Sequence, residues 1–221
     1  MPEFFVRHGV TVKQGVNNES NNIGLQANQV KAAARIVNKA VMCVLNAHSK
    51  LKHRVAGDTL RYAQRYFRFG ANGPTEAQRQ HMLGVLVLTL NGLRGEKTIV
   101  VDRHAFNDGA MGWASAIEVP DVHYAGTKQQ FPERKFHYET GTGNYRMYGE
   151  LNVSDHLLFG AQKIGLVTFI HEASHRYANT EDFGPEGISE DGVTFQQPGL
   201  TVAQALLNAE SYGWFAYKVG R

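Results

Sequence analysis

The chain of 221 residues has a single cysteine, Cys43, so it cannot form a disulfide bond within itself. Secreted eukaryotic enzymes of this size often carry several disulfides, and we expect Cys43, inside the apolar run 40–45, to be a buried, inert thiol. No stretch reaches the roughly 18 consecutive apolar residues of a membrane-spanning helix. The first residues also lack the basic segment and apolar core of a secretory signal peptide. We therefore expect a bacterial secreted effector or an excised toxin domain rather than a fungal secreted enzyme.

A strong excess of charge of one sign is also missing. The net charge is +3, and charged residues make up 19% of the chain. Lysine and arginine occur in short mixed clusters such as residues 49–54, which is typical of a solvated surface. We therefore expect no nucleic-acid partner. The hydrophobic content of 43% is enough for one core of ordinary size.

The distribution of residue types predicts an N-terminal arm over residues 1–24 and one folded domain over residues 25–221. The arm is polar and rich in Asn, Ser and Gly, with at most one short strand. No internal repeat is present. Apolar residues at helical spacing then predict a long helix over 26–51. Asp58 is expected to cap a second helix that ends at Gly70.

Two capping boxes predict further helix starts, at Thr75-Glu76-Ala77-Gln78 and at Thr201-Val202-Ala203-Gln204. The second opens a C-terminal helix that runs to about Val219. Short β-branched or alternating runs between turn residues predict four strands, over residues 97–102, 113–119, 135–139 and 145–153. A helical pattern returns over 161–177. The order of helices, strands and helices predicts an α+β fold with a small, mainly antiparallel sheet.

The segment His171-Glu172-Ala173-Ser174-His175 carries the chemistry. Residues i and i+4 share one face of a helix, so His171 and His175 can both offer an imidazole nitrogen to one Zn²⁺. Glu172 adjoins the first histidine and is placed to act as general base for a water activated by the metal. The apolar residues before His171 predict a buried helix that keeps the site rigid.

Zinc in a catalytic site takes a third protein ligand, and the sequence offers two sources. Asn179 can adopt the left-handed conformation that ends a helix, after which the chain can turn back and direct Asp182 at the metal. Glu181 is the neighbouring alternative on the same turn. Glu210, on the final helix, is the second source. If Asp182 binds the metal, we expect Glu210 to orient a ligand histidine instead.

The motif and its surroundings resemble the aspzincins, the deuterolysin and peptidyl-Lys metalloendopeptidase type of zinc peptidase. That family carries H-E-x-x-H followed by G-T-x-D-x-x-Y-G, and a C-terminal N-A-D-x-Y-x-x-F-A segment. This chain has Thr180-Glu181-Asp182, and then the run from Asn208 to Ala216. The resemblance implies a zincin-like fold, Asp182 as third zinc ligand, and hydrolysis of peptide bonds.

The chain departs from the family at four positions. Asn179 stands where the family has Gly, Glu186 where the second motif ends in Gly, and Glu210 where the C-terminal segment has Asp. Pro185 stands where the family has a Tyr that steadies the transition state. Another residue must then donate to the oxyanion, and the candidates are Tyr212, Tyr177 and His104. We favour Tyr212, because it lies in a segment that matches the family, and core packing is its alternative role.

The interpretation that follows is a zinc-dependent endopeptidase whose protein or peptide substrate adds to an edge strand of the sheet. Residues 145–151 are predicted to form part of that sheet, and Glu186, Glu190 and Asp191 could line an acidic pocket. Two alternatives remain open. One is a zinc amidase that acts on other amides, such as cell-wall peptides. The other is a binding domain of the same fold without activity.

Overall fold

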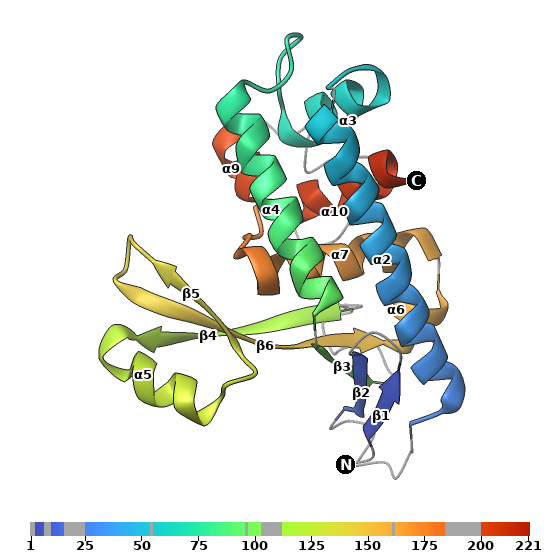
Figure 1. The fold of residues 1–221 in the computed structure, drawn as a ribbon, viewed down its shortest axis with the longest axis vertical. Coiled ribbons are helices and arrows are strands. Elements are labelled where there is room, and N and C mark those ends of the chain that lie inside the picture. The colour runs from blue at the N-terminus through green and yellow to red at the C-terminus, as the bar shows by residue number, and fades with distance from the viewer. Residues whose placement is uncertain are drawn as a thin grey trace.

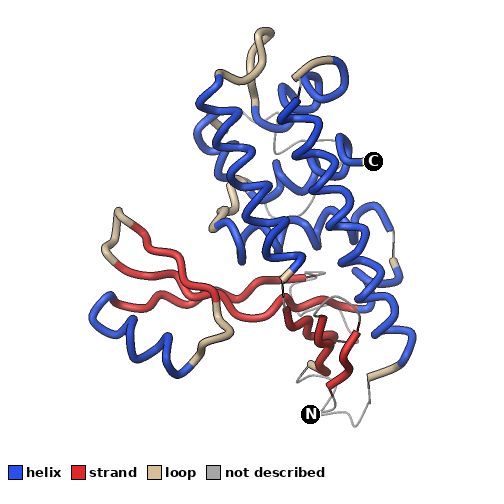
Figure 2. The backbone as a smooth tube through the Cα atoms, in the orientation of Figure 1, coloured by secondary structure: helices blue, strands red, loops and turns tan. Residues whose placement is uncertain are grey.

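The computed structural model describes residues 3–6, 10–15, 25–53, 55–95, 97–102, 112–160, 162–183 and 200–221. Predictions that concern His104, Pro185, Glu186, Glu190 and Asp191 lie outside these ranges. The described chain forms a helical body above a twisted sheet (Figure 1). Figure 2 shows the same division, with the strands gathered below and to one side of the helices. The α+β prediction is therefore confirmed.

In the part of the chain that the structure describes, the main helices of the body are α2 (Ala27–His53), α3 (Gly57–Phe67), α4 (Glu76–Arg94), α7 (Gln162–Ala178), α9 (Val202–Leu207) and α10 (Ala209–Gly220). Both predicted capping boxes are present, because Thr75 and Thr201 each accept a hydrogen bond from the backbone three residues on. Asp58 does not cap α3. The N-cap is Ala56, which forms no side-chain cap bond, and Asp58 lies in the first turn.

The sheet has six strands: β1 (Glu3–Val6), β2 (Val10–Gln14), β3 (Lys97–Asp102), β4 (Gly112–Pro120), β5 (Lys135–Glu139) and β6 (Asn144–Ser154). Their order is β1-β2-β3-β6-β4, and β5 pairs with the first half of β6. The sheet is mixed. β2 with β3 and β3 with β6 are parallel, and the other three pairings are antiparallel. The segment 1–24 thus holds two strands where at most one was predicted.

The outer part of the sheet extends away from the helical body (Figure 1). It consists of β4, β5, the first half of β6 and the short helix α5 (Asp121–Gln130), and we call it the β-lobe. Neither α5 nor the one-turn helix α6 (Asp155–Phe159) was predicted from the sequence. The β-lobe contacts α7 through Arg176. One of its guanidinium nitrogens donates to the Glu133 carbonyl, and the Arg176 carbonyl lies 2.9 Å from Nε2 of His137.

Glycines allow the helices of the body to approach closely. A Cβ on Gly213 of α10 would lie 2.9 Å from the carbonyl oxygen of Val167 on α7, and one on Gly92 of α4 would overlap the ring of Tyr177. Atoms at such distances repel, so the crossings of α7 with α4 and α10 require glycine. These crossings hold α7 between its neighbours. Cys43 is buried in the same core, as predicted.

The C-terminal helix differs from its prediction, because it is interrupted at Asn208. This residue has φ −79° and ψ 119°, which is extended backbone, so it ends α9 and begins α10. Across the described segments, no helix is both long and apolar enough to cross a membrane.

Candidate metal centre

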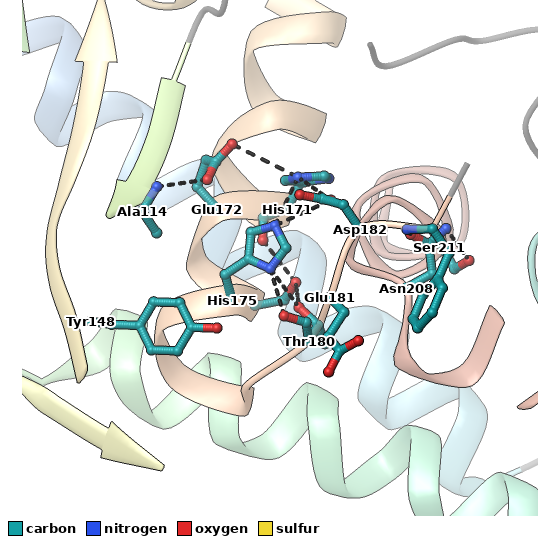
Figure 3. Close-up of polar contacts among 12 residues, drawn as sticks. Ala114, Tyr148, His171, Glu172, His175, Thr180, Glu181, Asp182, Asn208 and Ser211 are labelled. Carbon is teal, nitrogen blue, oxygen red and sulfur yellow. Dashed lines mark hydrogen bonds and ion pairs between the residues drawn. The ribbon is translucent and has the colours of Figure 1, made fainter. Parts of the chain in front are cut away.

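Helix α7 carries the histidine pair on a buried stretch of chain. Leu166, Val167, Phe169 and Ile170 before it are at most 6% exposed. These apolar side chains pack into the core, so the helix is held on several sides and cannot turn freely. Figure 3 shows the side chains of His171, Glu172 and His175 directed toward the same region. Their candidate ligand atoms all lie within 4.8 Å of one another.

Asn179 has φ 54°, the left-handed conformation that the sequence predicted for the end of this helix. Its backbone N–H donates to the carbonyl of His175, and the N–H of Thr180 reaches back to Ser174. The chain therefore reverses directly after α7. This reversal brings Asp182 back over the histidine face, as Figure 3 shows.

Three side-chain atoms converge at this point. Nε2 of His171 and Nε2 of His175 are 3.0 Å apart, and Oδ1 of Asp182 lies 3.1 Å from the first and 3.3 Å from the second. The imidazoles are 11% and 10% exposed, whereas the Asp182 side chain is 67% exposed. The two histidines form the floor of the site, and the carboxylate covers it from the solvent side.

The orientation of His175 is set by the backbone. Its Nδ1 lies 2.7 Å from the carbonyl oxygen of Thr180, so Nδ1 carries a proton and donates, which leaves Nε2 as the nitrogen directed at Asp182 and His171. The hydroxyl of Thr180 is bonded in turn to Ser174, at 2.8 Å. Nδ1 of His171 is buried and has no hydrogen-bond partner in the part of the chain that the structure describes.

Glu172 is anchored by one carboxylate oxygen. Its Oε2 accepts a hydrogen bond of 2.8 Å from the backbone N–H of Ala114 in β4, and its Oε1 lies 3.8 Å from Nε2 of His171. Burial raises the pKa of this carboxyl, and the nearby histidines only partly oppose the effect. A raised pKa makes the carboxylate a stronger base, which suits a group that must take a proton.

The charges of Asp182 and His175 support each other. Partial burial acts to raise the pKa of Asp182, but the hydrogen bonds from His171 and His175 outweigh it and hold that pKa well below its usual range. Burial acts to lower the pKa of His175, and the Asp182 carboxylate outweighs it, so the net shift is upward. Asp182 is therefore ionised at neutral pH and is in the state that binds a cation.

The structure places Tyr212 away from the role predicted for it. Its hydroxyl donates to the carbonyl of Leu206 at 2.7 Å, and its ring packs edge-on against Phe67 in the core. These contacts are the packing role that was its alternative, and they argue against Tyr212 as the oxyanion donor. Tyr177 is also buried, with its ring against Gly92.

Glu210 is buried in the first turn of α10. Within the described ranges, the side chains that can bind a metal and lie within 4.8 Å of one another are His171, Glu172 and His175, so this cluster includes neither Glu210 nor Asp182. The carboxylate oxygen in contact with both imidazoles belongs to Asp182, as the aspzincin resemblance implies. The role of Glu210 as an orienting group stays a prediction.

Sequence reasoning missed the groups that hold these side chains. Ala114 and Thr180 contribute backbone atoms, whose roles depend on the fold and leave no residue-type signal. Asn208 accepts a hydrogen bond from the N–H of Phe183, beside Asp182. The sequence did mark Asn208 as part of the family-like C-terminal segment, which was the one available signal.

The arrangement fits zinc. Tetrahedral zinc with ligand bonds of about 2.0–2.1 Å has ligand atoms about 3.3–3.4 Å apart, and the three separations here are 3.0–3.3 Å. Two imidazoles and one carboxylate also match the donor set of known catalytic zinc sites. Because Nδ1 of His175 donates to Thr180, its Nε2 is the nitrogen that can bind a metal once its own proton has left, and Asp182 is already ionised, as such a site requires.

Comparison with solved structures gives a match to a zinc peptidase from Grifola frondosa. The TM-score is 0.55 at 12% sequence identity, and the alignment covers 87% of this chain and 96% of that one. No protein-family model matches the chain. No curated protein sequence matches it either. The chain therefore has the fold of a zinc peptidase with a candidate metal site on α7, and its resemblance to the aspzincins is confirmed at the level of the fold.

Proposed function

We propose that the chain is a zinc-dependent endopeptidase. The observation that carries the proposal is the convergence of His171, His175 and Asp182, with each pair of ligand atoms 3.0–3.3 Å apart and Glu172 beside them. In this proposal the three side chains hold Zn²⁺, which would polarise the substrate carbonyl and make a water acidic near neutral pH.

Glu172 then moves the proton. Oε2 stays bonded to the N–H of Ala114, which fixes the plane of the carboxylate and leaves Oε1 on the histidine side. Oε1 takes the proton from the attacking water and delivers it to the leaving amine of the cleaved bond. Both transfers use the same oxygen, so the carboxylate does not have to reorient between them.

An extended peptide would pair with β4. Among the described strands, β4 has a partner on one side only, β6, and its residue Ala114 lies directly beside Glu172. The segment 145–151 is part of the sheet, as predicted, but it lies in β6, which pairs with β4 on one side and with β3 or β5 on the other. Backbone groups of a substrate can therefore add at β4 and not at β6.

The test is casein cleavage by the purified protein, before and after removal of metal by a chelator, with peptidoglycan fragments as a second substrate. We expect casein to be cleaved, activity to disappear with the chelator, and zinc to restore it. Cleavage of peptidoglycan fragments alone would assign the chain to the amidases. Stoichiometric zinc without hydrolysis of either substrate would make it a binding domain.

A further inference from the structure

The segment that carries Asp182 needs support from outside itself. Asp has a short side chain, so its carboxylate can stay 3.1 and 3.3 Å from two imidazoles only if the backbone is held in place. The side chain is 67% exposed, so packing around it contributes little. The restraint must come from the residues on either side of Asp182.

The residue before Asp182 is bonded to the point where α9 meets α10. The N–H of Glu181 donates to the carbonyl of Leu207 at 2.8 Å, and the carbonyl of Glu181 accepts from the N–H of Ala209 at 2.9 Å. The two segments thereby form an isolated parallel bridge between Glu181 and Asn208.

The residue after Asp182 is bonded to the side chain of Asn208. Oδ1 of Asn208 accepts from the N–H of Phe183 at 3.2 Å, and Nδ2 donates to the hydroxyl of Ser211 at 3.2 Å. Asn208 is 1% exposed, so the oxygen and the nitrogen of its side-chain amide both form these hydrogen bonds away from water. We call the contact of residues 181–183 with residues 207–209 the Asn208 junction.

Asn208 forms these bonds instead of the side-chain hydrogen bond that would cap α10. It is the N-cap of α10, where an Asn side chain normally accepts from the backbone N–H two or three residues on and thereby stabilises the helix. Its side chain makes no such cap bond. The oxygen that would cap α10 is turned to Phe183 instead. The helix start is thus left uncapped by this side chain, while the Asp182 segment gains a fixed partner.

We propose that Asn208 is a positioning residue that sets the direction of the Asp182 carboxylate. Its side chain holds Phe183, and its extended backbone places Leu207 and Ala209 where they hold Glu181. The assignment of Asp182 as a metal ligand rests on the proposed function. The hydrogen bonds that hold Glu181 and Phe183 are already formed in the metal-free chain. Because Glu181 and Phe183 are both anchored, the backbone between them has little freedom. Metal binding then costs less conformational entropy than it would with a free loop.

Two substitutions at position 208 distinguish the length of the side chain, which lets it bond to Phe183, from its ability to cap α10. Asn208→Ser and Asn208→Asp both place a good N-cap residue before α10. Only the aspartate keeps an oxygen at the position of Oδ1, because the serine hydroxyl is one bond shorter. Thr201→Ala is the matched control, since it removes the side-chain cap of α9 without touching the Asn208 junction.

The first measurement is amide hydrogen exchange at Glu181 and Phe183 in the metal-free protein, followed by NMR. For Asn208→Ser we expect exchange at Phe183 to rise by roughly tenfold, as loss of one ordinary hydrogen bond allows. The second measurement is zinc affinity by chelator competition, and for the same variant we expect a loss of about 10–100-fold. Asn208→Asp should restore both values toward wild type, and Thr201→Ala should change neither.

Three outcomes would overturn the proposal. Asn208→Ser could leave exchange at Phe183 or zinc affinity unchanged, Asn208→Asp could be as impaired as Asn208→Ser, or Thr201→Ala could reproduce the loss. If the wild-type chain bound no zinc, the proposed function would fail, yet the exchange measurement in the metal-free chain would still decide whether Asn208 holds the segment.

Discussion

The helical body and the β-lobe meet along α7, and they are packed in different ways. In the body, Trp214, Phe215 and Phe67 are fully buried, and the rings of Phe67 and Phe215 pack edge to face. In the β-lobe, α5 has no buried residue, and Val122 and Ile117 are 86% and 60% exposed. The body therefore buries more apolar surface than α5 and the exposed face of β4, and we expect it to be the main source of the stability of the fold.

The candidate site draws on both regions. The three proposed ligands come from α7 and the segment after it, which belong to the body. The partner of the proposed base comes from the β-lobe side, because Oε2 of Glu172 accepts from Ala114 in β4. Metal binding and proton transfer should therefore be separable by mutation, and each prediction below tests that separation.

The largest effect is expected at the ligands. The purified protein should hold about one zinc per chain, and His171→Ala should reduce this to near zero, because two ligands alone do not make a stable site. Asp182→Ala should lower zinc affinity more than Glu210→Ala, since the Asp182 carboxylate contacts both imidazoles. Elemental analysis and chelator competition measure these quantities. A Glu210→Ala protein that loses its metal while Asp182→Ala keeps it would reverse our assignment.

Glu172→Gln should separate chemistry from metal binding. The amide keeps the shape of the side chain but cannot take a proton, so peptidase activity should fall by about 10²–10⁴-fold. Zinc content should stay at the wild-type value, since the proposed ligands are untouched. Cleavage of casein and elemental analysis on the same preparation test both statements. Near wild-type turnover would remove Glu172 as the base.

Stability should depend on the body. Trp214→Ala removes a fully buried ring and should lower the free energy of unfolding by about 3–5 kcal/mol. Val122→Ala in α5 should change it by less than about 0.5 kcal/mol, because the side chain is exposed. Urea denaturation gives both values. Comparable losses in the two variants would show that the β-lobe is as important to the fold as the body.

The smallest effect is expected at the contact between the β-lobe and the helical body, where Ala114 of β4 bonds to Glu172 of α7. Ala114→Pro removes the N–H that anchors Glu172, and an edge strand tolerates proline. Activity should fall by about 10–100-fold, as loss of an orienting partner does, with zinc content unchanged. Ile117→Ala, an exposed change in the same strand, is the control. Loss of zinc in Ala114→Pro would mean that the β-lobe also supports the ligands.

The sequence predicted the elements whose signals are local. The capping boxes at Thr75 and Thr201, the left-handed Asn179 and the strands of the hairpin β5–β6 all depend on neighbouring residues, and all are present. The convergence of Asp182 on the histidine pair was also predicted, because the turn after α7 directs the chain back toward the histidines. The ligand roles and the bacterial effector interpretation stay predictions.

The features that the sequence did not predict depend on distant partners. The break at Asn208 lies inside a run with helical spacing, and it arises because Leu207 and Ala209 bond to Glu181, 26 and 28 residues earlier. Tyr212 was assigned to the site from its motif, whereas its hydroxyl bonds to Leu206 across that same break. The helix α5 has no apolar face in contact with the core, so it lacked the periodic signal used for the others.

The bridge between Glu181 and residues 207–209 also fixes an order of events during synthesis. The ribosome completes α7 and Asp182 well before it adds Leu207 and Ala209, so the two backbone bonds of Glu181 cannot form until the chain has passed that point. A nascent chain that already contains the whole H-E-x-x-H helix therefore still lacks the partners of its last site segment. The candidate site becomes complete only once α10 has been made and has docked against α7.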